Sequence, residues 1–228
     1  MISDPSNQLD LFYHNSEFSE LKSLYLSNKL PNKILISGKK GIGKCTLAYH
    51  LVNFILSSDE EFSYNLNHLK INQNNKTYKL IQNKSHPNFT LVDLIEEKKN
   101  IDINQIRNLI LDLNKSSFNT KPRLVLIDNI ELLNINSVNA LLKILEEPNN
   151  NINFILINNN KKKLLTLTSR CLEFKIHLNM KQSIEIANKI LNVDVTNLIN
   201  DELVHNYISV GQLSLIHISE PTRPLIIS

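Results

Sequence analysis

The sequence predicts a parallel α/β domain followed by a smaller helical domain, and three observations support this fold class. Short apolar runs that read as buried strands alternate with segments whose apolar residues follow helical spacing. The first run leads through the segment GKKGIGK into a helix, the strand–loop–helix context of a phosphate-binding loop. From Met180 onward the pattern is helical only. Alternation of this kind indicates a parallel sheet covered by helices on both faces, with ligands at the carboxyl ends of the strands.

The elements follow in a regular order. The expected strands are 32–38, 88–94, 123–129, 153–159 and 171–176. The expected helices are 18–28, 44–56, 101–113 with Asp102 near its start, and 136–147, which Pro148 ends. Residues 58–87 are polar and rich in asparagine, so we expect a long surface insertion or mobile loop there, without chemistry.

The chain divides into three parts in this interpretation. Residues 1–177 form the nucleotide-binding domain, and 178–211 form part of a helical lid domain. The stretch LSLIHISEPTR resembles the translation of an adapter used in sequencing libraries. We therefore expect 212–228 not to belong to the natural chain, which would stop near Gly211.

Composition narrows the class of protein. With 228 residues, 42% of them hydrophobic, the chain can bury a core of one domain and a smaller neighbour. The net charge of +3 is too small to indicate nucleic acid by itself. Cys45 and Cys171 lie far apart, which favours neither a disulfide framework nor a four-cysteine zinc site. No apolar run reaches membrane-spanning length and no signal peptide begins the chain, so we expect a soluble cytoplasmic protein.

The phosphate-binding loop carries one discordant residue. Gly38, Gly41 and Gly43 let backbone N–H groups approach phosphate oxygens, and Lys44 reaches the outer phosphates of a nucleotide. The next residue usually places a hydroxyl on magnesium, but here it is Cys45, whose thiol is a poor ligand for that hard cation. Thr46 does not simply replace it, because the next helical side chain points about 100° away.

A second acidic motif follows the strand at 123–129. Asp128 ends the run LVLID, where a carboxylate can hold magnesium through water. In ATPases of this kind the next residue is usually a glutamate that orients and deprotonates the attacking water. Here it is Asn129, whose amide can position a water but cannot accept its proton. Glu131 lies two residues too far along to take that role without a local rearrangement.

Two further motifs carry a resemblance to a known family. The segment NSVNALLKILEEP at 136–148 followed by LTLTSRC at 165–171 resembles the paired signature of clamp-loader subunits of the AAA+ family. The segments KLPNKILISGKKGIGKCTLA and SHPN extend the match. Residues 8–211 are similar to the delta-prime type of these subunits, which belong to the bacterial DNA polymerase III holoenzyme. The resemblance implies a RecA-like AAA+ domain that binds ATP with magnesium.

The resemblance assigns roles to particular residues. Ser169, Arg170 and Cys171 match the motif whose arginine reaches the nucleotide of a neighbouring subunit, so Arg170 would be an arginine finger acting in trans. Cys171 itself reads as a small packing residue. Asn158 matches the position of a polar sensor of the terminal phosphate, with a register uncertain by one residue in the run NNN. Arg107 matches a position that touches the DNA backbone, although an isolated arginine on a helix is usually solvated.

Some features of the family are absent from this sequence. Many relatives carry a cysteine-rich zinc module before the HP segment, but no cysteine occurs there and we expect no zinc. The helical collar domain that holds these subunits in a ring is also missing, so stable assembly of this chain by itself is not expected. The partners implied are motor and delta-like clamp-loader subunits, with the sliding clamp and primed DNA reached through the complex.

Cys45 and Asn129 are two independent departures that indicate ATP binding without useful hydrolysis. The chain would then act by completing the active site of an adjacent motor subunit with Arg170. Two alternatives stay open. One is a motor subunit that hydrolyses ATP with Asn129 and a rearranged Glu131, and the other is an AAA+ scaffold or signalling protein unrelated to replication.

Overall fold

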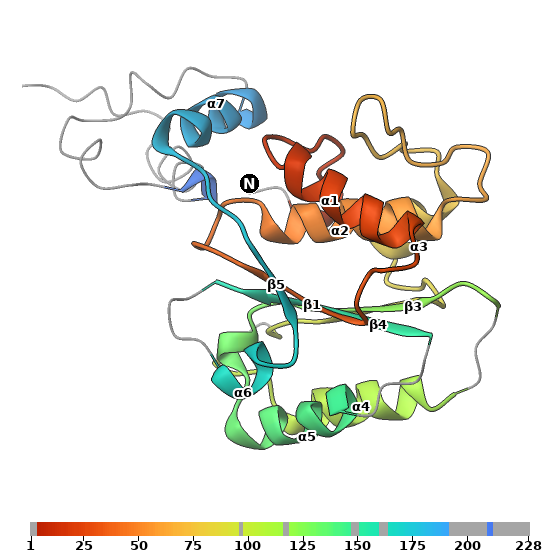
Figure 1. Cartoon of the computed structure of the whole chain (residues 1–228), viewed down its shortest axis with the longest axis vertical. Helices are drawn as coiled ribbons and strands as arrows, with labels where there is room; N and C mark the ends of the chain where they lie inside the picture. The colour runs from red at the N-terminus through yellow and green to blue at the C-terminus, as the bar shows by residue number, and fades with distance from the viewer. Residues whose placement is uncertain are drawn as a thin grey trace, which may run out of the picture.

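The structure is a computed structural model that describes residues 4–95, 98–115, 119–146, 151–159, 164–191 and 209–211. Within these residues a parallel sheet lies at the centre, with strand order β2-β3-β4-β1-β5 (Figure 1). The strands are β1 (Lys33–Ser37), β2 (Phe89–Val92), β3 (Arg123–Ile127), β4 (Ile152–Asn158) and β5 (Leu172–Lys175). All expected strands are therefore present.

The strands form because their side chains are buried on both faces of the sheet. In β1 and β3 the last four residues are buried, and in β4 six of seven are. Such runs are typical of the inner strands of a parallel sheet, where alternation between polar and apolar residues is not needed. The outermost strands β2 and β5 are shorter and keep exposed positions such as Leu91 and Leu172.

Helices cover both faces of the sheet in two layers (Figure 1). We call the first the α2 layer: α1 (Asn15–Leu26), α2 (Lys44–Leu56) and α3 (Lys76–Gln82). We call the second the α5 layer: α4 (Ile103–Leu113), α5 (Ile135–Glu146) and α6 (Leu165–Thr168). Two short 3₁₀ turns, η1 (Pro5–Asn7) and η2 (Ile130–Leu132), join these elements. Each layer has its own hydrophobic core against one face of the sheet.

The start of α4 shows how the sequence sets a helix boundary. The Asp102 side chain accepts hydrogen bonds from the backbone N–H groups of Asn104 and Gln105, and the Gln105 side chain accepts from the Asp102 N–H. This reciprocal arrangement satisfies N–H groups that have no partner inside the helix. The helix expected at 101–113, with Asp102 near its start, is confirmed, and Asp102 is its N-cap.

The polar segment 58–87 is more ordered than the sequence indicated. It contains α3, which Asn75 caps by accepting a hydrogen bond from the Tyr78 N–H at 2.8 Å. Ile71 and Ile81 are buried in the core of the α2 layer. The expectation of a surface insertion or mobile loop is wrong for this part. The few apolar residues among the asparagines are spaced so that they reach α2.

A helix follows the last strand, as the helical pattern from Met180 onward predicts. Helix α7 (Met180–Leu191) follows β5 and lies on the side of the α2 layer in Figure 1. In the part of the chain that the structure describes, no helix has the length and apolarity required to cross a membrane. The expectations for Pro148 and for residues 212–228 fall outside the described residues.

Candidate nucleotide-binding site

The phosphate-binding loop joins β1 to α2 and is shaped by its glycines. A side chain at Gly38 would meet the Ile176 carbonyl oxygen at 2.4 Å, so the loop passes too close to the backbone after β5 for any larger residue. Gly43 adopts φ 87°, a left-handed conformation that favours glycine, and directly precedes the first residue of α2. The loop therefore presents the N-terminus of α2 to a phosphate, as its sequence predicts.

Lys44 is folded back onto this loop. Its side chain is buried, and its Nζ donates to the carbonyl oxygens of Gly38, at 3.0 Å, and Lys39. Burial lowers the pKa of Lys44 to about 8, although Asp128 and Glu131 favour its charged form. The ammonium thus occupies the centre of the loop, where it is held by carbonyl groups that phosphate oxygens could replace.

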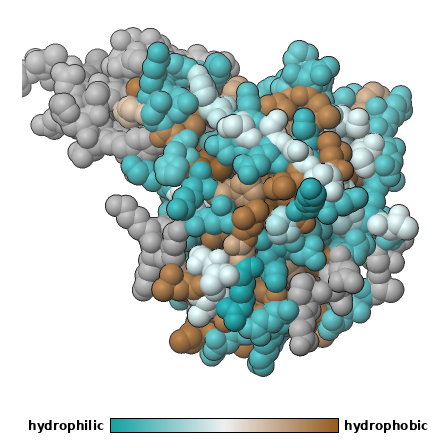
Figure 2. Space-filling view, viewed as in Figure 1, coloured by the Kyte–Doolittle hydropathy of each residue, from teal (hydrophilic) through white to brown (hydrophobic). Residues whose placement is uncertain are grey.

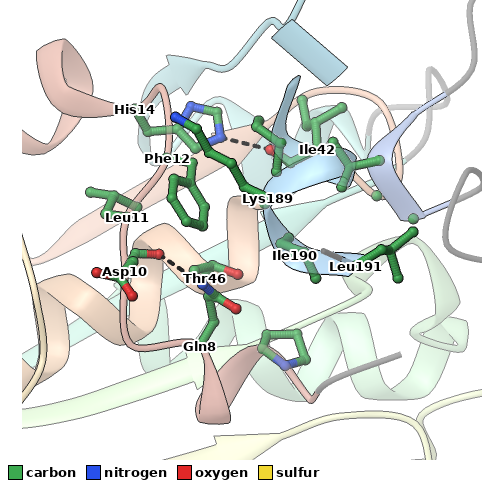
Figure 3. Close-up of a pocket in the computed structure, with 16 residues that line it drawn as sticks. Gln8, Asp10, Leu11, Phe12, His14, Ile42, Thr46, Lys189, Ile190 and Leu191 are labelled. Atoms are coloured by element: carbon green, nitrogen blue, oxygen red, sulfur yellow. Dashed lines mark hydrogen bonds between the residues drawn. The ribbon is translucent and has the colours of Figure 1, made fainter. Parts of the chain in front are cut away.

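A pocket of about 480 Å³ lies beside the loop (Figure 3). Its walls come from the N-terminal segment before α1, from the loop with Thr46, from α7 and from Val210 and Gly211. The ammonium of Lys189, on α7, lies 5.6 Å from the centre of the Phe12 ring. The pocket combines apolar and aromatic side chains with a few polar groups, as small-molecule sites do.

His14 closes one side of this pocket. Its Nε2 lies 2.6 Å from the Ile42 carbonyl oxygen (Figure 3), and because a carbonyl only accepts, Nε2 must be the donor. Nδ1 is then an acceptor, and it is buried without a hydrogen-bond partner among the described residues. Burial lowers the pKa of His14, so the neutral ring is favoured. This neutral ring holds the loop at Ile42.

The C-terminal described residues also touch the loop. The backbone N–H of Gly211 donates to the Gly41 carbonyl at 3.0 Å, and a side chain at Gly41 would meet the Ser209 hydroxyl at 2.6 Å. Residues 209–211 therefore pack directly against the phosphate-binding loop, and the pocket is formed by segments far apart in the sequence.

Cys45 points toward the acidic motif, beside Asp128. Burial is the main reason that the pKa of the Cys45 thiol is raised well above its ordinary value, and the Asp128 carboxylate adds to the effect. The Asp128 pKa is raised too, chiefly by burial and then by Asp93. A thiol that stays protonated beside a carboxylate does not match the hard oxygen ligands that magnesium requires. The loop fits the phosphates of a nucleotide, whereas the Cys45 position does not fit the metal.

Asn129 stands in the position of the usual catalytic glutamate and is bound on both sides of its amide. Its Nδ2 donates to the Asp93 carboxylate at 2.8 Å, and its Oδ1 accepts from Asn159 Nδ2 at 2.9 Å. Its backbone adopts φ 54°, an unusual conformation that asparagine tolerates better than most residues. The amide therefore joins the ends of β2, β3 and β4.

The polar residue that faces Asp128 is Asn159. Asn159 Nδ2 lies 3.3 Å from the Asp128 carboxylate, whereas Asn158 is buried at the end of β4 and pairs with Ser37 across the sheet. Successive side chains of a strand point to opposite faces, so a shift of one residue changes the side of the sheet. The predicted sensor position falls on Asn158, but the geometry brings Asn159 to the acidic motif.

Glu131 comes nearer to the site than its spacing indicated. The 3₁₀ turn η2 brings its carboxylate to the Asn159 backbone N–H, at 3.1 Å. Glu131 also favours the charged form of Lys44. The local turn thus supplies part of the rearrangement that the sequence seemed to require.

Arg170 lies at the opposite end of the sheet. Leu172 pairs with Ile34 in parallel register, so Arg170 is level with the residues before β1, whereas the loop follows Ser37 at the end of that strand. Leu172 is thus four strand residues, or about 13 Å, before Gly38, and Arg170 precedes it in the turn after α6. The guanidinium is partly exposed and bonds to Glu146 at 2.7 Å and to the Thr166 carbonyl at 2.7 Å.

Two predicted positions, Arg107 and Cys171, lie outside the phosphate-binding loop and the acidic motif. Arg107 is exposed on α4, whose buried face is formed by Ile106 and Leu109. Cys171 packs against the core of the α5 layer, and burial raises its pKa to about 11, which agrees with a packing role.

Several site residues have no signal in the sequence. Phe12 and His14 lie before the first helix in a segment without a motif, and Asp93 follows an edge strand at the end of a common apolar run. Glu146 lies inside the recognised signature, but its contact with Arg170 spans 24 positions. Only the fold brings these residues to their partners.

Taken together, the strand order, the loop between β1 and α2 and the acidic residue after β3 define an AAA+ domain of the RecA-like P-loop class. Within that class, the family described as DNA polymerase III, delta subunit, matches residues 13–180, and the chain belongs to this family.

Curated relatives agree with this assignment. The chain is 31% identical over 140 residues to DNA polymerase III subunit delta' of Pseudomonas aeruginosa, covering 61% of this chain and 41% of that protein. It is 30% identical to the delta' subunit of Buchnera aphidicola subsp. Baizongia pistaciae, over 68% of this chain and 47% of that protein. It is 31% identical to the delta' subunit of Bacillus subtilis, over 66% of this chain and 44% of that protein. The chain thus spans less than half the length of these relatives.

Proposed function

We propose that this chain is the ATP-binding part of a delta-prime-like clamp-loader subunit of DNA polymerase III, which completes the active site of a neighbouring motor subunit with Arg170. In this proposal residues 1–177 form the AAA+ domain and 178–211 part of the lid.

The observation that carries the proposal is the place of Arg170. It precedes β5, whose first residue lies about 13 Å from the phosphate-binding loop, and so stands at the amino end of the parallel strands. An arginine side chain cannot bridge that distance, so any phosphate it meets belongs to another chain. The guanidinium is always charged and matches phosphate oxygens with a rigid fork of donors, which suits this work.

The chain's own site supports binding rather than hydrolysis. Gly38, Gly41, Gly43 and Lys44 would hold the phosphates of ATP, and the pocket beside Thr46 would hold the rest of the nucleotide. ATP with magnesium would supply a cleavable terminal phosphate. Asn129 cannot take a proton from an attacking water, and both ends of its amide are already bonded. We therefore propose that this site binds nucleotide and does not turn it over usefully.

One observation favours a second candidate, a motor subunit that hydrolyses its own ATP. Glu131 lies at the edge of the acidic motif, bonded to the Asn159 N–H, and could reach a water after a small movement of η2. In the assembled complex, a loss of turnover with Glu131→Gln as large as that caused by Lys44→Ala would favour this candidate.

The decisive experiment uses the full-length protein assembled with motor subunits, clamp and primed DNA, because even true motors of this kind need a neighbour's arginine. Arg170→Ala should lower ATP turnover and clamp loading at least tenfold while assembly is preserved, since arginine fingers contribute about 10³ to 10⁵ in turnover. Arg170→Lys keeps the charge without the fork and should restore little. Unchanged turnover with Arg170→Ala would overturn the proposal.

Contacts of the complex with DNA are part of the same proposal. Arg107 is exposed on α4 and could meet a phosphate of the DNA backbone. In that case Arg107→Ala should make the slope of the logarithm of the DNA-binding constant against the logarithm of salt concentration shallower by about one. An unchanged dependence would assign Arg107 to the solvated surface.

A further inference from the structure

The Arg170 side chain is held at two points. Its Nη1 donates to the Thr166 carbonyl at 2.7 Å, and its Nη2 donates to Glu146 Oε1 at 2.7 Å. Because the guanidinium is planar and rigid, one bond at each terminal nitrogen fixes the orientation of the whole group. Arginine has five N–H groups, so these two bonds leave the fork able to meet a phosphate.

The two acceptors belong to different elements. Thr166 belongs to α6 and lies four residues before Arg170, which follows that helix. Glu146 is the last residue of α5. Each helix is anchored in the core of the α5 layer by a fully buried leucine, Leu167 in α6 and Leu145 in α5. The guanidinium is therefore fixed between two supports that are themselves fixed to the sheet.

The pair is not buried as a structural ion pair would be. The exposed fraction of the side chain is 36% for Arg170 and 52% for Glu146. Exposed ion pairs contribute little to folding stability. The exposed leucines Leu165 and Leu172 lie on either side of Arg170 in the sequence, and Figure 2 shows hydrophobic surface at the lower left, where α6 lies in Figure 1. The geometry thus presents an oriented guanidinium on a surface with apolar neighbours, which suits a protein partner.

We propose that Glu146 is a positioning residue that orients Arg170 toward the phosphates of the neighbouring subunit. This inference rests on the proposed role of Arg170. Holding a flexible side chain in its working orientation before association removes the entropy loss that binding would otherwise incur. It also sets the geometry at the phosphate, where small displacements reduce turnover strongly.

The opposite role, in which Glu146 competes with the phosphate for the guanidinium, predicts changes of the other sign. If the carboxylate sequesters Arg170, removing it should raise turnover in the neighbour. If it orients Arg170 by accepting a hydrogen bond, an amide oxygen at the same place should do nearly as well, because it accepts in the same geometry. Alanine and glutamine at position 146 therefore separate the two roles.

The test measures ATP turnover of the assembled full-length complex, with assembly and thermal unfolding recorded for each variant. Glu146→Ala should lower turnover about tenfold, as expected for a displaced catalytic group. Glu146→Gln should stay within about twofold of the original protein. In an Arg170→Ala background Glu146→Ala should have no further effect, which a general loss of structure would not produce. Asp112→Ala, which removes another exposed ion pair, with Lys115 at 2.5 Å, is the matched control for Glu146→Ala and should change nothing.

Two results would overturn this inference. Turnover that rises or stays unchanged with Glu146→Ala, while Arg170→Ala abolishes it, refutes the positioning role and leaves the proposed function intact. Turnover that is unchanged with Arg170→Ala refutes both, because no finger then needs to be positioned.

Discussion

Polar side chains at the two ends of the sheet differ in their hydrogen bonding and in their exposure. At the carboxyl end, Lys44 bonds to the carbonyls of its own loop and Asn129 bonds to Asp93 and Asn159, so the site is largely satisfied from within. At the amino end, the charged Arg170 donates a hydrogen bond to Glu146 and remains partly exposed. Side chains that are satisfied internally suit holding a ligand, whereas an oriented and exposed charge suits acting on another molecule.

The largest expected effect concerns the support of the Arg170 end. Leu167 is fully buried and anchors α6, so Leu167→Ala should lower the free energy of unfolding by about 2–5 kcal/mol. Leu165, in the same short helix, is 75% exposed, and Leu165→Ala should change it by less than about 0.5 kcal/mol. Chemical denaturation measures both variants. Equal effects would show that α6 is not anchored by Leu167 and would weaken the comparison.

The second prediction is that low pH destabilises the α2 layer. His50 is fully buried between Tyr64 and the Gln8 carbonyl, and burial lowers its pKa to about 4. Burial likewise lowers the pKa of His86 to about 4. The unfolded chain then binds more protons than the folded one between about pH 6.5 and pH 4, so stability should fall as the pH falls through that window.

The size of this effect follows from the shift. One pKa unit corresponds to about 1.36 kcal/mol, so His50 by itself should remove on the order of 3 kcal/mol across the window. His50→Gln should make the dependence of unfolding free energy on pH clearly shallower, because only His86 and other groups still contribute. His68→Gln, at an exposed position, is the matched control and should keep the full slope. A slope that is the same in all three proteins would contradict the prediction.

The smallest expected effect separates binding from metal use at the carboxyl end. Lys44→Ala should weaken binding of a fluorescent ATP analogue about tenfold, because it removes a cation from the centre of the loop. Cys45→Thr should leave binding without magnesium unchanged but should make it about tenfold stronger when magnesium is added, since a hydroxyl is a suitable ligand.

Titration of the chain with and without the metal checks this prediction. Cys45→Ser provides a second hydroxyl of nearly the same size as the thiol and should behave like Cys45→Thr. If magnesium strengthens binding to the original chain as much as to these two variants, Cys45 does not limit metal use, and the contrast between the two ends becomes weaker.

Much of the fold could be predicted because inner strands are buried on both faces of the sheet and therefore appear in the sequence as apolar runs. β1, β3 and β4 are found in this way, and the Asp102 cap marks the start of α4. The order of segment 58–87 could not be predicted, since only a few apolar residues among many asparagines anchor it to α2. Sparse contacts of this kind are invisible without the partner surface.

The site could be predicted only as a set of residues. The sequence by itself determined that a phosphate-binding loop precedes α2, that Cys45 replaces a hydroxyl and that Asn129 replaces a carboxylate, because residue identity and short spacing carry that chemistry. It also determined the fold class, because periodicity is a local property.

Only the tertiary structure decided which of these residues meet. It placed Asn159, the residue directly after β4, against Asp128. It put Arg170 at the far end of the sheet from its own loop and brought Glu146 to it. These relations depend on strand register and on packing between helices distant in the sequence, and no local pattern encodes them.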